Sequence, residues 1–494
     1  MMQLTHSGLQ QDDPYHLAIA ELLAKGDVLT KLPWAKHTIL AERFGDLHFG
    51  YHAYLAAFIK LFGAALGGKL GTIMAGAVLL LVVVAIAGRE NRWRGVLPMV
   101  MLVSSEVFLL RVMGIRPIAF GAAAMLSVIP LATKRRFGVL ALVGALFASS
   151  YAAFPLLFLP LVAHVIARAM TARELAWRPT VSVLLGVLIG LLLHPNVRTE
   201  LEVLAVQLFD VSTDRSGHNL EFTPPGFAKL VKDAWLVLVI LGVGARYARR
   251  AWHDAPKRRE ELLAWSLLAG LTLLLYVRYE RGVDYFVPAA VTFAAIASGR
   301  RATRLAPTRA ALAAGGLLVV GGGILHASRA WTQSRRFEAI DPRACAVWLE
   351  RNSEPGDEVF IHDYGTFPRL FYHNRRNVYT LGLDPGFMRA HDPALWRRYL
   401  AAARLESDPY PLIAETLGAR YVYVEKTPIG RPFYDYLRAH ASQFRPVYRD
   451  DFAAVFSVVR PISTRAREHS IELGLTGDSE FFVDVRQMPA HRIR

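Results

Sequence analysis

The sequence is poor in cysteine and in charged residues. Its 494 residues include one cysteine, Cys345, which excludes an intrachain disulfide and a thiolate metal cage. Charged residues make up only 20% of the chain and hydrophobic residues 53%, whereas a soluble domain carries about 25% charged residues. Residues 1–16 also lack the apolar core of a secretory signal peptide. The low content of cysteine and of charged residues argues against a soluble protein and against one stabilised by disulfide bonds.

The hydrophobic residues gather in apolar runs. Runs of about 16 to 21 residues have roughly the length that a helix needs to cross a hydrocarbon core of about 30 Å. The sequence therefore predicts a mostly α, polytopic transmembrane bundle of about ten spans over residues 68–326. The predicted spans are 68–88, 95–112, 117–132, 137–150, 153–170, 179–194, 233–248, 260–277, 284–299 and 309–326.

Positive charge is distributed unevenly along the chain. Lys and Arg number 57 against 41 Asp and Glu, a net charge of +16. In a soluble protein this excess would suggest nucleic acid, but here the basic residues concentrate in one alternate set of loops between the apolar runs. Basic loops stay cytoplasmic. We therefore expect no nucleic-acid partner, and we expect the other loops and both termini to face the periplasm or exterior of a bacterial-type inner (plasma) membrane.

Residues 1–67 form the first external segment in this topology, although nothing before them drives export. We expect a further transmembrane helix upstream of Met1. A longer reading frame that encodes one more apolar run of about 20 residues would support it. Within the segment, residues 14–25 predict a short amphipathic helix and residues 49–62 an interfacial helix. If residues 49–62 spanned the membrane instead, the charge bias of every later loop would be inverted.

The composition changes after the last predicted span. Residues 335–460 alternate short β-like runs with helical patterns, which predicts a small extracytoplasmic α/β domain. Residues 461–494 lack periodicity and are interpreted as a tail or as added strands. The β-like runs are 358–362, 421–425 and 453–459, and the helical patterns include 344–351 and 411–417.

An acidic pair stands at the start of the first predicted helix. Asp12 and Asp13 precede Pro14, which suits the first helical position, and His16 follows. One interpretation is simple capping by Asp13. The other is a site in which the carboxylates act as a base or as metal ligands at the lipid–water boundary. Asp13 and Asp12 are therefore the candidate catalytic residues.

A second polar cluster precedes the interfacial segment. Asp46 and His48 alternate, and His48 and His52 stand four residues apart, which places the two imidazoles on one helix face. Carboxylate and imidazole groups are able to bind a divalent ion. Asp46 and His48 are therefore candidate metal ligands, the alternative being ordinary polar contacts at the interface.

Two arginines lie in a short external loop, where positive charge is scarce. Arg278 and Arg281 carry guanidinium forks that suit phosphate oxygens, so we expect them to bind a lipid phosphate. The alternative is snorkelling, or pairing with Glu280. Glu221, in the long loop 195–232, and Asp363, at the end of a predicted strand, are candidates for a further acidic or acceptor contact. A strand-to-helix turn would also explain Asp363.

These motifs resemble those of the GT-C glycosyltransferases, which include oligosaccharyltransferases, protein O-mannosyltransferases and aminoarabinose transferases. Asp13-Pro14-Tyr15-His16 with residues 17–23 resembles the acidic motif in the first external loop of oligosaccharyltransferases. Residues 50–94 resemble that family's interfacial helix and the helix after it. Arg281 with residues 285–288 resembles its external arginine segment, which contacts the carrier phosphate.

The resemblance implies a GT-C-like fold and a membrane glycosyltransferase. Such an enzyme moves a hexosyl, pentosyl or oligosaccharyl group from a polyprenyl-phosphate donor to a lipid, glycan or protein acceptor on the non-cytoplasmic side. It also implies that Asp13 activates the acceptor or binds a divalent cation, Mg²⁺ or Mn²⁺, and that Arg281 holds the donor phosphate. In that family a helix precedes the first acidic loop, which agrees with the expected upstream helix.

The sequence departs from the family at two motifs. Residues 111–116 contain no carboxylate where oligosaccharyltransferases carry a second acidic pair. The family's Trp-Trp-Asp-Tyr-Gly motif, which reads the acceptor sequon, is reduced here to Asp363-Tyr364-Gly365 after His362. Asparagine glycosylation and that family's metal site are therefore not expected, and Asp46 and His48 are the candidate replacements for the lost ligands.

A non-catalytic alternative is a membrane protein that transports or binds a lipid-linked glycan. Transporters place polar sites at mid-membrane, in broken helices or inverted repeats. The polar clusters of this chain lie instead at the external ends of its predicted spans, which favours an interfacial enzyme. A third interpretation is a binding protein in which the α/β domain carries the function and the bundle anchors it in the membrane.

Overall fold

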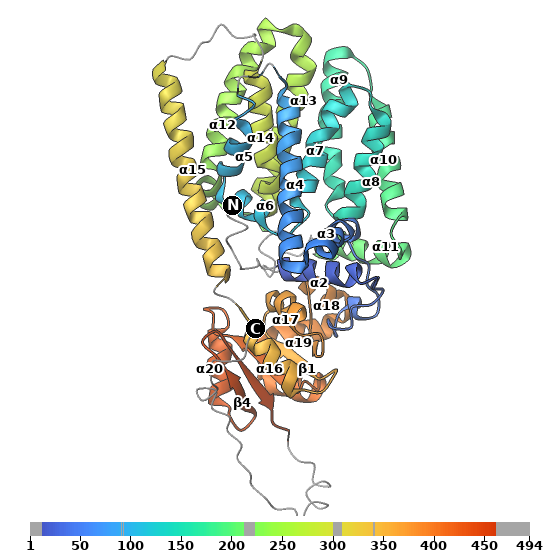
Figure 1. Cartoon of the computed structure of the whole chain (residues 1–494), viewed down its shortest axis with the longest axis vertical. Coiled ribbons are helices and arrows are strands. Elements are labelled where there is room, and N and C mark those ends of the chain that lie inside the picture. The colour runs from blue at the N-terminus through green and yellow to red at the C-terminus, as the bar shows by residue number, and fades with distance from the viewer. Residues whose placement is uncertain are drawn as a thin grey trace, which may run out of the picture.

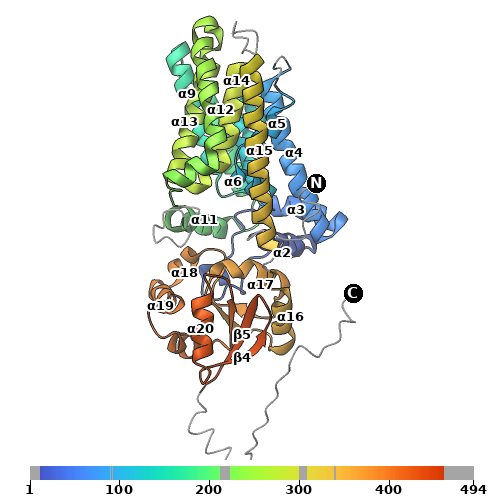
Figure 2. The same ribbon diagram turned by 90° about the vertical axis from the view of Figure 1, so that its left-hand side faces the viewer.

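The computed structural model describes residues 12–89, 91, 93–211, 223–299, 309–338 and 341–460. Long helices stand side by side in a bundle, short helices lie across one end of it, and a smaller α/β unit covers that end (Figures 1 and 2). The predicted fold class, mostly α with a small sheet, is confirmed. The boundaries 1–67, 68–326, 335–460 and 461–494 remain predictions, and the predicted tail lies outside the described residues.

A helix is present at every predicted span, although residues 95–112 form two helices. Ser105 interrupts that span, because its hydroxyl caps the second helix by accepting a hydrogen bond from the Phe108 amide. The bundle helices are α4 (Ala64–Ala87), α5 (Leu97–Val103), α6 (Glu106–Met113), α7 (Ile118–Thr133), α8 (Phe137–Ser150), α9 (Phe158–Ala172), α10 (Trp177–Leu192), α12 (Phe227–Asp254), α13 (Arg259–Arg278), α14 (Val283–Ser298) and α15 (Arg309–Glu338).

Length and composition identify fewer spans than the ten that were predicted. Within the described part of the chain, three helices are long and apolar enough to cross a membrane, over Ala64–Ala87, Phe154–Ala172 and Pro256–Arg278. Two pairs of helices are bent by 110° and 114° at the break between their members. If each pair is counted as one span, the number rises to five. The count of ten remains a prediction.

Helices α8 and α10 pack against each other through small residues. Gly144 of α8 and Gly186 and Gly190 of α10 lie at the crossing, and a Cβ atom on Gly186 would collide with the backbone of Ala141. Small residues let helix backbones approach closely where lipid removes the hydrophobic drive for association. The crossing therefore leaves little room for a side chain larger than that of glycine at these positions.

Three short helices lie across the end of the bundle that faces the α/β unit. They are α2 (Asp13–Ala24), α3 (Phe49–Phe62) and α11 (Val197–Val206) (Figure 1). The predicted interfacial helix at residues 49–62 is thus a separate helix, and Gly63, with φ of +77°, separates it from α4. The expected amphipathic helix is α2, but the residues from Asp13 to Ala20 are all buried. The helix packs against both α3 and the α/β unit, so little of it faces solvent.

The α/β unit is built on a five-stranded sheet with the order β2-β1-β3-β5-β4. β1, β2 and β3 are parallel, and β5 runs antiparallel to both β3 and β4. The strands are β1 (Glu358–Ile361), β2 (Val378–Tyr379), β3 (Tyr421–Glu425), β4 (Phe444–Arg449) and β5 (Ala453–Val458), and the helices are α16 (Arg343–Asn352), α17 (Phe367–His373), α18 (Pro385–His391), α19 (Pro393–Ala403) and α20 (Arg431–Ala439).

The strands predicted from apolar runs are present as β1, β3 and β5. The helical pattern at 344–351 is α16, and that at 411–417 is a short π-helix, Pro411–Thr416. β2 and β4 were not predicted. β2 has only two residues, and β4 is a largely exposed edge strand. Neither therefore carries the apolar pattern of a buried strand.

The first external segment is attached to the edge of this sheet. Ala35 forms a parallel bridge with Tyr379, the Tyr379 amide donates to the Trp34 carbonyl (2.8 Å), and the Lys36 amide donates to the Tyr379 carbonyl (3.0 Å). The Trp34 indole N–H also donates to the Arg375 carbonyl, 2.7 Å away. Residues more than 300 positions apart are thereby fixed to each other at the end of the bundle.

The α8–α10 crossing yields a stability prediction. Gly186→Ala should destabilise the protein by about 1–3 kcal/mol, because the added methyl group forces two tightly packed backbones apart. The measurement is the thermal unfolding midpoint of the purified protein in detergent.

Gly138→Ala is the matched control, because Gly138 lies in α8, the other helix of the crossing, and a Cβ atom on it meets nothing within 4 Å. It should leave the midpoint unchanged or raise it slightly. Equal midpoints for the two variants would contradict the close crossing.

Candidate functional site

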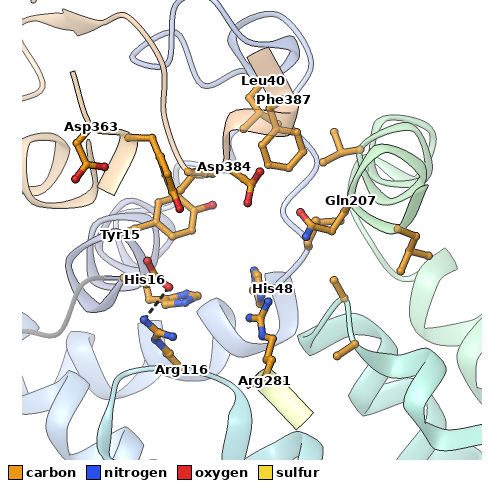
Figure 3. Close-up of a pocket in the computed structure, with 18 of the residues that line it drawn as sticks. Tyr15, His16, Leu40, His48, Arg116, Gln207, Arg281, Asp363, Asp384 and Phe387 are labelled. Atoms are coloured by element: carbon orange, nitrogen blue, oxygen red, sulfur yellow. Dashed lines mark ion pairs between the residues drawn. The ribbon is translucent and has the colours of Figure 1, made fainter. Parts of the chain in front are cut away.

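A cavity of about 920 Å³ lies where the bundle end, the first external segment and the α/β unit meet. Figure 3 shows the side chains of His16, His48, Arg116 and Arg281 on the bundle side of this cavity. Asp363, Asp384 and Phe387 line it from the α/β unit. Polar groups from segments far apart in the sequence therefore converge on one space.

The two predicted catalytic carboxylates have different surroundings. Asp12 lines the cavity, and its Oδ2 lies 2.9 Å from Nη2 of Arg116. Asp13 is buried, and its Oδ1 accepts a hydrogen bond from the Ile115 amide at 2.8 Å. Asp12 is the N-cap residue of α2 but makes no side-chain capping bond, so capping does not account for the pair. Both carboxylates instead hold the turn between α6 and α7.

The two predicted phosphate-binding arginines are also separated. Arg281 lines the cavity, with its guanidinium carbon 5.9 Å from the centroid of the Tyr151 ring. Arg278 is exposed and stacks on Tyr279 at 4.6 Å, outside the cavity wall. Arg116 lines the cavity but was not predicted as a site residue. It carried the same signal as Arg281, an arginine in a short external loop.

A chain of hydrogen bonds leads from the interior to the cavity. Oδ2 of Asp46 accepts from Nδ1 of His52 at 2.7 Å, and Nε2 of His52 lies 2.8 Å from Nδ1 of His16. Asp46 and His52 are buried and do not line the cavity, whereas His16 does. His48 also lines it, 5.1 Å from His16 between ring centroids.

The predicted metal pair does not form a ligand set. Oδ1 of Asp46 accepts from the His48 amide and Oδ2 from His52, so both carboxylate oxygens are engaged with protein donors and only His48 faces the cavity. Among the residues that the structure describes, no group of three or more His, Cys, Asp and Glu side chains could hold a metal ion. Asp46 does not fit the role of metal ligand in this arrangement.

Burial favours the neutral form of the two imidazoles of the cluster that line the cavity. It lowers the pKa of His16 well below the ordinary value and that of His48 to about 3. Burial alone would raise the pKa of Asp46, but the charge and the hydrogen bond of His52 hold that pKa below its ordinary value. The cluster therefore combines one carboxylate with two rings, His16 and His48, whose neutral form is favoured by burial.

A second buried acid lies behind this cluster. Glu200 of α11 lies 3.4 Å from Nε2 of His194, and both side chains are buried. Burial, with a smaller contribution from Asp46, raises the pKa of Glu200 to about 8, and burial lowers the pKa of His194. Both groups are therefore neutral at neutral pH, and Asp46 holds the negative charge of this cluster.

Asp363 lies on the cavity wall formed by the α/β unit. Its Oδ1 accepts from the Gly365 amide at 2.9 Å, so it also forms the expected strand-to-helix turn. The preceding His362 lines the cavity and stacks on Phe433, with ring centroids 5.4 Å apart. The remaining predicted site residue, Glu221, lies outside the described residues.

Comparison of the sequence with family models gives no match, and no curated protein matches it. Solved structures do match. One is the oligosaccharyltransferase AglB from Archaeoglobus fulgidus in complex with an inhibitory peptide and a dolichol-phosphate, with a TM-score of 0.59 at 11% identity over 92% of this chain and 71% of that chain.

The fold is that of an archaeal oligosaccharyltransferase.

Two further structures of an Archaeoglobus fulgidus oligosaccharyltransferase agree. The apo form has a TM-score of 0.55 at 10% identity, covering 85% of this chain and 66% of that chain. The form tethered to an acceptor peptide containing the NVT sequon has a TM-score of 0.56 at 11% identity, covering 92% of this chain and 71% of that chain. The resemblance predicted from the motifs is thus confirmed at the level of the fold.

The buried Glu200 predicts a pH dependence of stability. Because its folded pKa of about 8 exceeds the ordinary value of 4.5, the folded state retains a proton that the unfolded chain releases between these two values. Wild-type stability should fall relative to Glu200→Gln by about 1.4 kcal/mol per pH unit in this window. Thermal unfolding midpoints from pH 5 to pH 8 measure the difference.

Glu202→Gln, on the same helix, is the control and should not produce this pH-dependent difference, because its hydrogen bond with Arg43 lowers the pKa of Glu202 below the ordinary value. A constant difference between wild type and Glu200→Gln from pH 5 to pH 8 would show that Glu200 is not held protonated.

Proposed function

We propose that this protein is a membrane glycosyltransferase that moves a sugar from a polyprenyl-phosphate donor to an acceptor on the non-cytoplasmic side. The main support is the cavity, in which Arg116 and Arg281 face Asp12 and His16 at the end of a bundle with apolar helices. An amphiphilic donor requires this combination, because its tail stays in lipid while its phosphate and sugar reach polar groups.

The arginines form the proposed donor side. Arg281 and Arg116 line the same cavity, and Arg116 is held by Asp12. When the bond between the anomeric carbon and the phosphate breaks, negative charge grows on the phosphate oxygens, and fixed guanidinium groups stabilise it. The solved AglB complex with a dolichol-phosphate is consistent with a phosphate-bearing lipid here.

Of the two predicted catalytic carboxylates, we assign Asp12 to the donor side, because it lines the cavity and holds Arg116 there. Asp13 holds the turn behind it through Ile115. Asp363, on the opposite wall, is assigned to the acceptor side. The acceptor is a lipid, a glycan or a protein. The peptide in one AglB structure and the tethered acceptor peptide in another support an acceptor path in this fold.

A divalent cation remains part of the prediction only through His48, the one proposed ligand on the cavity wall. A bound Mg²⁺ or Mn²⁺ ion would supply further positive charge for the leaving phosphate. No step of the mechanism is assigned to such an ion, because the carboxylate oxygens of Asp46 are engaged with His52 and with the His48 amide.

The test is a transfer assay in membranes that contain the expressed protein and its acceptors. Undecaprenyl-phosphate hexoses and pentoses carrying a labelled sugar serve as donors. Arg281→Gln should reduce transfer at least about 100-fold, because it removes a cation aimed at the leaving phosphate. The readout is label recovered in the acceptor fraction.

Arg278→Gln is the matched control, since Arg278 is exposed and stacks on Tyr279 outside the cavity. It should transfer at close to the wild-type rate. Wild-type transfer by Arg281→Gln would contradict the donor site. Saturable binding of the labelled lipid without any product, with the whole donor panel and native acceptors, would favour the alternative of a protein that binds or transports a lipid-linked glycan.

The assignment of the carboxylates generates a further prediction. Asp12→Asn should reduce transfer at least about tenfold, because the neutral amide no longer holds Arg116 by charge. Asp13→Asn should reduce transfer less than Asp12→Asn does, because the amide oxygen of the new Asn side chain still accepts the hydrogen bond from the Ile115 amide. The same labelled donors report both rates. Loss of transfer confined to Asp13→Asn would reverse the assignment.

A further inference from the structure

The hydrogen-bonded chain Asp46–His52–His16 is not used by the donor site described above. It joins the loop before α3, α3 itself and α2, and its two contacts measure 2.7 Å and 2.8 Å. Asp46 is 6% exposed and His52 is fully buried. Only the His16 end reaches the cavity. Buried carboxylate–imidazole chains are costly unless every member is satisfied, so this arrangement requires an explanation.

The hydrogen bonds of Asp46, His52 and His16 indicate which ring nitrogen atoms carry protons. A carboxylate only accepts, so Nδ1 of His52 carries the proton directed at Asp46. When Nδ1 carries the only proton of the His52 ring, its Nε2 is an acceptor, and the proton in the second hydrogen bond belongs to Nδ1 of His16. Nε2 of His16 is therefore left with its lone pair, on a ring that lines the cavity. The tautomer of His16 is set by Asp46, two hydrogen bonds away.

The surroundings of His16 suit a proton acceptor. Once a proton arrives, the carboxylate of Asp46 stabilises the imidazolium through His52, because opposite charges attract strongly in a site of low dielectric constant. The other candidates are less suitable, since Asp12 is paired with Arg116 and Asp13 with the Ile115 amide.

We propose that His16 is the general base of the transfer reaction and that His52 and Asp46 are its positioning residues, so that the acceptor group is a hydroxyl. This inference rests on the proposed function. The acceptor oxygen attacks the anomeric carbon, and Nε2 of His16 takes the hydroxyl proton. The bond from the anomeric carbon to the phosphate oxygen breaks, and its electron pair leaves with the phosphate beside Arg281 and Arg116. The products are a glycoside, the polyprenyl phosphate and a protonated His16.

The test uses the full chain in native membranes with the labelled undecaprenyl-phosphate donors. His16→Gln should lower kcat about 100-fold or more while the KM for the donor stays close to wild type. His52→Phe and Asp46→Asn should each lower kcat less than His16→Gln, because His16 then keeps its nitrogen but loses its fixed tautomer. His253→Gln, on the exposed face of α12, is the matched control and should have no effect.

Chemical rescue separates catalysis from structure. Added imidazole should restore part of the kcat of His16→Gly, because it fits the space of the missing ring, and should not restore the kcat of Arg281→Gln. Wild-type kcat in His16→Gln would overturn the inference, as would a loss of donor affinity without rescue in His16→Gly. In either case the proposed function would stand if Arg281→Gln still abolished transfer. Absence of transfer by the wild type, with every donor, would refute the proposed function itself.

Discussion

The attachment of the first external segment to the α/β unit determines the geometry of the whole site. Ala35 pairs with Tyr379 at the sheet edge, and the buried carboxylate of Glu358 contacts Lys36 at 2.8 Å and His37 at 3.0 Å. Since this segment also carries α2 and the loop before α3, the same backbone pairing fixes residues of both cavity walls. This pairing adds a backbone connection to the packing of α2 against the α/β unit and so helps to fix the distance between the two cavity walls.

The turn between α6 and α7 shows how positive charge is held at the bundle end. It carries no carboxylate where the resembled family has an acidic pair. Arg111 instead binds both oxygens of the fully buried Asp284 at 2.8 and 3.0 Å, and Arg116 binds Asp12. Each arginine is compensated by a carboxylate from another element, which offsets the cost of removing the charge from water. The turn therefore brings one oriented guanidinium group, that of Arg116, to the cavity in place of acidic ligands.

Local pattern was sufficient to predict the bundle helices apart from the break between α5 and α6, the strands β1, β3 and β5, and the polar character of both site segments. It could not predict which side chains meet. The rings of His48 and His52 lie 5.9 Å apart between centroids, but His48 is the N-cap residue of α3 and faces the cavity, while His52 turns to Asp46 and His16. That division depends on α2, which lies 36 residues away in the sequence. The sequence around Arg278 and Arg281 likewise does not show which of the two side chains reaches the cavity. In the structure, the one-turn helix at Glu280–Gly282 orients Arg281 differently from Arg278.

The Asp12–Arg116 pair connects the two halves of the proposed reaction. Before a donor binds, Asp12 supplies the negative charge that keeps Arg116 oriented in a partly open site. A donor phosphate near Arg116 would share that guanidinium, so Asp12 would become less compensated and attract positive charge more strongly. His16 lies on the same helix one turn away and lines the same cavity. Donor binding would therefore make a protonated His16 more favourable, which couples arrival of the phosphate to removal of the acceptor proton.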